Sequence, residues 1–184
     1  ILMGAAWYNS LANRGIRWAY REAAYLRKPV PPAVRNAARD DLVKLCSHGD
    51  DLVRYRATRR LAERPDPAAF DALKVCLDDE NFLVRKNAIV ALGRIAPKSD
   101  PDLADRLLRF IIERKPPENA MLRSFAAGAA GRLGEPAVGS LARLAREGHP
   151  SIRIYPVQAL GETGTSDPNA IATLVDLLAD SDQR

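Results

Sequence analysis

The 184-residue sequence has few of the side chains on which catalytic, metal and disulfide sites depend. Its two cysteines, Cys46 and Cys76, cannot form a disulfide framework, and its two histidines, His48 and His149, lie 101 residues apart. The longest apolar runs are only a few residues, whereas a membrane-spanning helix needs about 20. No catalytic group, metal site or cofactor is therefore expected.

Charge of one sign is not in large excess. The chain has 28 basic and 23 acidic residues, a net charge of +5, which is a mild bias rather than a polybasic signature. Hydrophobic residues make up 47% and charged residues 28%, which is typical of a folded globular chain and not of a disordered one.

A short pattern occurs four times, at intervals of 30 to 38 residues. Each copy has an apolar residue, then arginine, then a small residue or proline three positions later, and then a pair made of leucine or alanine followed by alanine or glycine. The four arginines are Arg54, Arg85, Arg123 and Arg153. Self-similarity at this period is the sign of a repeat architecture.

A second pattern lies between the arginines and predicts a helix in each interval. An acidic residue followed by proline occurs at residues 66–67, 100–101, 135–136 and 167–168, and proline suits the first turn of a helix. Apolar residues then follow at i, i+3, i+6 and i+7, which form one stripe of a helix. No alternating strand pattern is present, so the predicted fold is all-α, an α-solenoid of antiparallel helix pairs in which each unit is an arginine-containing helix followed by a proline-led helix.

The segment before the first arginine divides into two predicted parts. Residues 34–48 fit a leading proline-type helix, so residues 32–184 are expected to form the repeat array and residues 1–31 an N-terminal capping or docking helical segment. Trp7, Trp18 and Tyr25 fall approximately on one helical face there. Three roles remain open for residues 1–28: a cap on the first repeat, docking to a partner subunit, and contact with a membrane surface.

The motifs "VR..A...LG.I" at Val84–Ile95 and "IR......LGETG" at Ile152–Gly164 resemble the HEAT-repeat family, especially its short HEAT-like repeats of the phycobilin-lyase type. The resemblance covers roughly residues 32–184. It implies a solenoid with one helix of each pair on the convex side and the other lining the concave side. The lyase resemblance implies a pigment-handling enzyme but assigns no residue of this chain to that chemistry.

The repeated arginines and small residues are predicted to be structural. Acidic residues precede each arginine, so a ladder of arginine–carboxylate pairs is expected at the turns between repeats. These acidic residues are Asp50, Asp51, Asp79, Glu80, Glu118 and Glu147. A row of phosphate-binding arginines is the alternative. The small residues, including Gly93 and Gly131, are expected where the two helices of one unit pack together.

The candidate partner-binding residues lie on the proline-led helices and in the N-terminal segment. They are Lys44, Arg106, Arg109, Arg143, Arg146, Trp7 and Trp18. Basic and acidic residues alternate on the predicted concave surface, so a solvated face is one interpretation and an acidic peptide or protein surface the other. Arg56, Arg59, Arg60 and Arg64 form a further basic cluster, interpreted as an exposed helix face.

We therefore expect a non-enzymatic HEAT-like scaffold that binds protein partners within a larger assembly. No polar closing helix follows the last repeat, which also favours an assembly. A nucleic-acid-binding repeat protein and a phycobilin-lyase-like enzyme are the alternatives. Two buried-looking cysteines are compatible with a reducing cytoplasm, which is the expected compartment, although the start of the chain is also compatible with processing.

Overall fold

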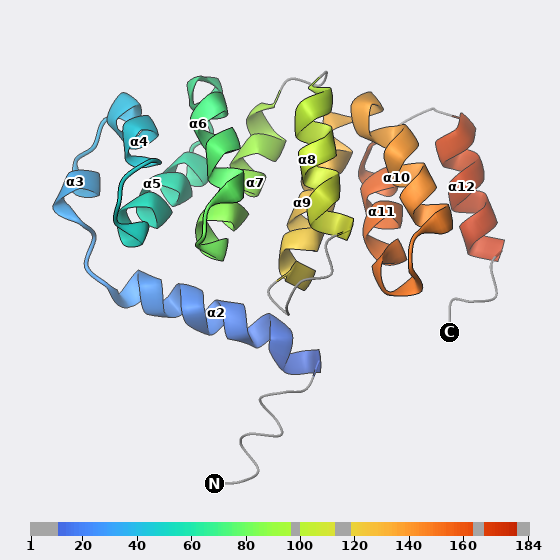
Figure 1. Ribbon diagram of the computed structural model, residues 1–184, viewed down its shortest axis with the longest axis horizontal. Helices are drawn as coiled ribbons and strands as arrows, with labels where there is room; N and C mark the ends of the chain where they lie inside the picture. The colour runs from blue at the N-terminus through green and yellow to red at the C-terminus, as the bar shows by residue number, and fades with distance from the viewer. Residues whose placement is uncertain (1–10, 97–99, 113–118, 164–167, 180–184) are drawn as a thin grey trace, which may run out of the picture.

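The computed structural model describes residues 11–96, 100–112, 119–163 and 168–179, and all regular structure within these ranges is helical (Figure 1). The α-helices are α2 (Leu11–Arg27), α3 (Pro32–Arg35), α4 (Arg39–Leu45), α5 (Asp51–Glu63), α6 (Phe70–Val75), α7 (Phe82–Ile95), α8 (Pro101–Ile112), α9 (Asn119–Leu133), α10 (Glu135–Glu147), α11 (Pro150–Thr163) and α12 (Pro168–Ala179). Two 3-10 turns, η1 (Pro67–Ala69) and η2 (Cys76–Asp78), flank α6. The predicted all-α solenoid is confirmed.

The helices form two layers. The arginine layer consists of α5, α7, α9 and α11, each packed against the next. The proline layer contains α4, α6, α8, α10 and α12, of which α8, α10 and α12 pack successively side by side. The closest contacts between the layers join α4 to α5, α6 to α7, α8 to α9 and α10 to α11. The tightly packed hairpin therefore starts with a proline-layer helix, the reverse of the order in the predicted unit.

Side-chain caps explain where several helices begin. The Asp50 carboxylate accepts a hydrogen bond from the Leu52 N–H at 2.8 Å, and the Asn81 side chain accepts one from the Leu83 N–H at 2.9 Å. Asp66 caps η1 in the same way, through the Ala68 N–H at 2.9 Å. Such caps satisfy N–H groups that have no partner within the helix.

Two predicted helix starts differ from the structure. The helix expected over residues 34–48 is split into α3 and α4 by residues 36–38, and the helix expected from Pro67 opens as the 3-10 turn η1, so that α6 begins only at Phe70. The four-residue α3 buries Val34 completely, which holds it against the array although it is too short to be stable alone.

The hydrophobic core runs continuously between the layers. In α4, α6, α8 and α10 a central leucine is fully or almost fully buried; these leucines are Leu42, Leu73, Leu107 and Leu141. Ile171 of α12 differs, because 49% of its surface is exposed although the pattern placed it in the core stripe. Among the described residues, α12 packs on α10 and α11 and has no helix on its other side.

Small residues let neighbouring arginine-layer helices approach each other. A Cβ atom at Gly93 of α7 would lie 2.8 Å from the Ala129 Cβ of α9. One at Gly131 of α9 would lie 2.7 Å from the Ala159 carbonyl oxygen of α11. The glycines therefore serve the packing between successive repeats, not the packing within one unit that the sequence interpretation expected.

Helix α2 belongs to neither layer. It runs across the row of repeats, against α5 and α7 (Figure 1). The division of the chain at residue 31 remains a prediction. Trp7 lies outside the described residues, and Trp18 is a residue of α2.

Candidate functional site

The first repeated arginine, Arg54, binds two turns at once. Its Nε and Nη2 atoms donate to the two carboxylate oxygens of Asp79 at 2.6 and 3.1 Å, and its Nη1 donates to the carbonyl oxygens of His48 and Gly49. The side chains of Arg54 and Asp79 are only 16% and 7% exposed. The hydrogen bond to Asp79 raises the pKa of Arg54. This fork joins the turn before α5 to the turn before α7.

The partner of Arg54 is therefore the acidic residue of the following turn. Asp50 and Asp51, which precede Arg54 in its own repeat, act elsewhere: Asp50 caps α5 and Asp51 accepts a hydrogen bond from Tyr25. The expected pairing of Arg54 with these residues is corrected.

The later arginines of the row bind backbone carbonyls in the turns that precede their own helices. Arg85 Nη1 donates to the carbonyl oxygens of Asp79 and Glu80 at 2.5 and 2.9 Å, and Arg153 Nε donates to that of Gly148 at 2.8 Å. Arg123 occupies the same position in α9 and is partly buried, whereas Glu118 lies outside the described residues. These contacts hold turns between helices and leave the guanidinium groups poorly placed to receive a phosphate.

The basic candidates on the proline layer differ in how they are paired. The Arg106 Nη2 atom lies 2.5 Å from a carboxylate oxygen of Asp78, and the Arg146 Nη2 atom lies 3.7 Å from one of Asp176. At the far end of the layer, the Lys44 Nζ atom lies 3.5 Å from a carboxylate oxygen of Asp41.

Arg109 of α8 and Arg143 of α10 are exposed, and neither has an ion-pair partner within the part of the chain that the structure describes. Helices α8 and α10 are adjacent, so the two arginines are exposed on neighbouring helices of the proline layer.

Apolar side chains are exposed on other helices of the same layer. Val75 of α6 is 67% exposed, and Ile171 and Val175 of α12 are 49% and 58% exposed. Arg109 and Arg143 thus lie on helices between α6, which exposes Val75, and α12, which exposes Ile171 and Val175. The sequence interpretation had proposed only charged residues of this layer as partner-binding candidates and had placed Ile171 in the core stripe.

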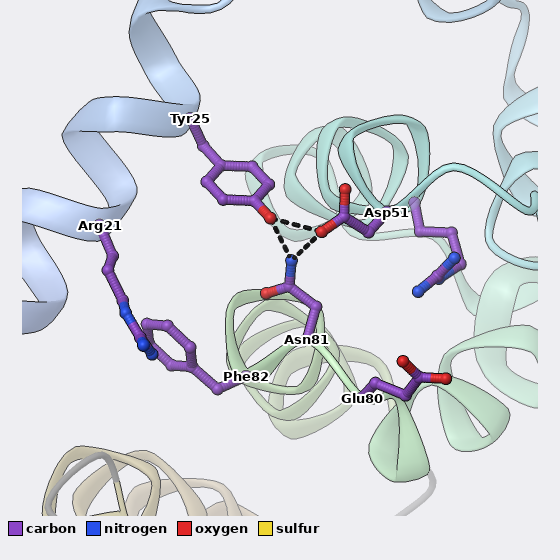
Figure 2. A pocket seen from close by; sticks show the side chains of 7 residues that line it. Arg21, Tyr25, Asp51, Glu80, Asn81 and Phe82 are labelled. Carbon is purple, nitrogen blue, oxygen red and sulfur yellow. Dashed lines mark hydrogen bonds between the residues drawn. The ribbon is translucent and has the colours of Figure 1, made fainter.

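A second polar site joins α2 to the array (Figure 2). The Tyr25 hydroxyl donates to the Asp51 carboxylate, and the Asn81 side-chain amide donates to both, at 2.8 and 3.0 Å. The Tyr25 ring meets the Tyr55 ring edge to face, with centroids 5.2 Å apart. Three separate segments therefore meet at one carboxylate.

An open cleft of about 420 Å³ lies beside this joint. Its lining consists of Arg21, Tyr25, Asp51, Arg54, Glu80, Asn81 and Phe82 (Figure 2). Burial, followed by the hydrogen bond to Asp51, raises the pKa of Tyr25, and the hydrogen bond from Tyr25 lowers the pKa of Asp51. Both shifts move these groups away from proton exchange near neutral pH, so this pair is unsuited to general acid–base chemistry.

Glu22 forms the other anchor of α2, and sequence analysis missed it. Its carboxylate oxygens lie 2.6 and 2.7 Å from the Lys86 ammonium nitrogen, and the Tyr55 hydroxyl donates to one of them at 3.2 Å. The side chains of Glu22 and Lys86 are only 14% and 10% exposed. A usable signal existed, since Glu22 is the only acidic residue among the first 39.

The basic cluster interpreted as an exposed helix face is corrected at Arg56 and Arg60, whereas Arg64 is exposed as expected. Arg56 Nη2 donates to the carbonyl oxygens of Tyr25, Leu26 and Lys28 at the end of α2, and Arg60 Nη1 donates to that of Val34 in α3. Both arginines are partly buried. They bind the N-terminal helices through the carbonyls that lack a partner at a helix C-terminus.

Histidine, cysteine and acidic side chains are the remaining groups of chemical interest in the described residues. Within them no three His, Cys, Asp or Glu side chains are grouped so that they could hold a metal ion. Cys46 and Cys76 are buried free thiols in successive helical segments, and the Cys76 thiol donates to the Cys46 carbonyl oxygen at 3.7 Å. The contact between the two side chains, together with burial, raises the pKa of Cys76, whereas the same contact lowers the pKa of Cys46. The Cys76 thiol is therefore held protonated, which makes it a poor nucleophile. None of the described helices is both long enough and apolar enough to cross a membrane.

Comparison with known families identifies the repeats. Residues 39–120, from α4 into the start of α9, match the family model of HEAT repeats. This stretch is an array of HEAT repeats. The same two-layer packing continues through α12, beyond the matched HEAT segment. The phycobilin-lyase subtype is not confirmed, and no curated protein matches the chain.

Proposed function

We propose that this HEAT-repeat scaffold is a non-enzymatic component of a larger assembly and binds an acidic protein segment on the exposed face of its proline layer. The observation that supports this most directly is the pair Arg109 and Arg143. These are exposed cations on adjacent helices, and neither is neutralised by an ion pair among the described residues.

The exposed aliphatic residues favour a partner that is amphipathic as well as acidic. Val75, Ile171 and Val175 are each about half to two-thirds exposed on helices that flank α8 and α10. A partner with carboxylates in its middle and apolar residues toward its ends matches this order, since charge gives specificity and apolar burial gives affinity.

A protein partner suits this face better than nucleic acid does. Asp41, Asp71 and Asp105 are exposed on the same layer, and a phosphate backbone would meet them as well as the arginines. Nucleic-acid grooves generally present a continuous basic stripe.

The test is binding of a synthetic amphipathic acidic helix of about 20 residues, which spans roughly 30 Å. Fluorescence anisotropy should show binding that weakens with salt. The double variant Arg109→Glu/Arg143→Glu should bind at least about tenfold more weakly, because opposite charges across an interface become like charges.

The matched control is Arg27→Glu/Arg35→Glu, which changes the net charge equally on other helices. It should alter the affinity by less than about twofold. Absence of binding, or equal loss in both variants, contradicts the proposed site.

A further inference from the structure

The positive charge of this protein is concentrated at one end of the chain. Residues 1–39 contain seven basic residues and one acidic residue, whereas residues 40–184 contain 21 basic and 22 acidic residues. The basic residues are Arg14, Arg17, Arg21, Arg27, Lys28, Arg35 and Arg39. The segment therefore has a net charge of +6, and the remaining chain has a net charge of −1.

The single carboxylate of this segment is turned inward. Glu22 is 14% exposed and bound to Lys86 of α7, so it does not offset the positive charge on the outer side of α2. Arg27 and Arg35 are exposed, and neither has an ion-pair partner among the described residues. Arg39 differs, because it lies 2.5 Å from Asp66.

Apolar side chains are exposed beside these cations. Tyr20 is 67% exposed, Leu26 is 42% exposed and Val30 is 38% exposed. Tyr20 and Arg27 are seven residues apart, which places them on one side of α2, opposite the Glu22 and Tyr25 that contact the arginine layer. The helix thus has one face docked on the repeats and another on which Tyr20 and Arg27 are exposed to solvent.

We infer that the outer face of α2 and the exposed residues that follow it, as far as Arg35 of α3, bind the surface of an anionic lipid bilayer. Cations attract the acidic headgroups, and tyrosine and aliphatic side chains enter the boundary between headgroups and acyl chains. Exposed aliphatic residues beside the cations favour a bilayer over nucleic acid, because leucine and valine gain nothing from a phosphate backbone. The proline-layer face is separate from this surface.

Flotation of the 184-residue chain with lipid vesicles tests the inference. The protein should float with phosphatidylcholine vesicles that contain about 30% phosphatidylserine, and not with pure phosphatidylcholine vesicles. Arg27→Glu/Arg35→Glu should reduce the bound fraction roughly tenfold or more, since each basic residue near such a surface contributes substantially to binding. Tyr20→Ser leaves the charge unchanged and should reduce binding roughly threefold through the lost apolar contact.

The matched control is Arg109→Glu/Arg143→Glu, which makes the same charge change on the proline layer and should bind vesicles like the unmodified chain. Circular dichroism establishes that each variant keeps its helices. The inference is overturned by equal binding to both vesicle types, by no binding to either, or by equal losses in the two double variants. It is also overturned if a labelled DNA duplex binds at lower protein concentration than the anionic vesicles do.

Discussion

Arginine side chains in this protein bind the backbone at several helix ends. Arg56 binds the end of α2, Arg60 binds α3, and Arg94 Nη1 donates to the Ala62 carbonyl oxygen near the end of α5 at 2.7 Å. The last carbonyls of a helix lack a partner and form the negative end of its dipole, so a cation with several donors suits them. At the scale of the residue, arginine therefore orders helix ends as much as it pairs with carboxylates.

The Arg54–Asp79 fork is the strongest of the described carboxylate contacts in the repeated turns, and it gives a stability prediction. Asp79→Ala should lower the free energy of unfolding by about 2–3 kcal/mol, because a charged hydrogen-bonded pair with little exposure is lost. Asp78→Ala is the control, since Asp78 is 82% exposed although it binds Arg106, and should cost less than about 1 kcal/mol. Urea denaturation measures both, and equal losses would contradict the assignment.

The contact between Tyr25 and Asp51 predicts a pH dependence. The folded protein lowers the pKa of Asp51, so its stabilisation is present above the unfolded value near 4 and is lost as pH falls through the folded pKa. Asp51→Asn should cost about 1–2 kcal/mol at pH 7. The difference between the two proteins should shrink toward zero in acid, as measured by urea unfolding at pH 7, 5 and 3. A difference that is constant with pH would contradict this role.

The raised pKa of Tyr25 acts at the other limit. Because folding favours the protonated phenol, its contribution is full below the unfolded value near 10 and is lost as pH rises through the folded pKa. Helix α2 should therefore be held most firmly at pH values between the unfolded pKa of Asp51, near 4, and the unfolded pKa of Tyr25, near 10.

At the scale of the helix, the arginine layer depends on close approach of successive backbones. Gly131 faces the Ala159 carbonyl oxygen at a distance that leaves no space for a methyl group. A methyl group at Gly139 in α10, by contrast, would have no atom within 4 Å. Both glycines lie inside helices, so the same substitution has opposite consequences at the two positions.

Gly131→Ala should destabilise the protein by roughly 1–3 kcal/mol through overpacking between α9 and α11. Gly139→Ala should stabilise it by about 0.5–1 kcal/mol, because alanine favours the helix and meets nothing. Thermal or urea unfolding of the two variants measures the contrast. A stabilised Gly131→Ala variant would show that the arginine layer is less tightly packed than described.

At the scale of the whole molecule, each helix contacts mainly its neighbours in the array. Helices α7 and α9 have described neighbours on both sides, whereas α12 has them on one side only and α2 is attached largely by polar side chains. In such quasi-one-dimensional arrays local opening is easiest where one neighbour is missing.

Hydrogen exchange should therefore form a gradient along the chain. Backbone amides of α7 and α9 should exchange most slowly, and those of α12 and α2 at least about tenfold faster, since tenfold in exchange corresponds to only about 1.4 kcal/mol of opening free energy. Mass spectrometry of deuterated peptides measures this. Uniform protection from α2 to α12 would indicate a single cooperative unit instead.

The repeated motifs predicted the principal helices of the array because their signals are local. Arginine, proline and apolar spacing each act within one or two helical turns, so α5 and α7 to α12 follow from them. The break at residues 36–38 and the 3-10 opening at Pro67 lack such a signal. Arg109 and Arg143 could be named from the sequence as partner-binding candidates, and that role stays a prediction. The sequence could not place Glu22 against Lys86, 64 residues away.

Local sequence alone was enough to predict an all-helical chain with a repeat length of about 33 residues, because helix caps and apolar periodicity depend on neighbours in the chain. Which carboxylate Arg54 binds, which helices the glycines bring together and where α2 lies were settled only by packing. Each of these depends on distances between residues that are 25 or more positions apart, and many partners of equal chemistry compete for such contacts. Three-dimensional proximity selects one of them.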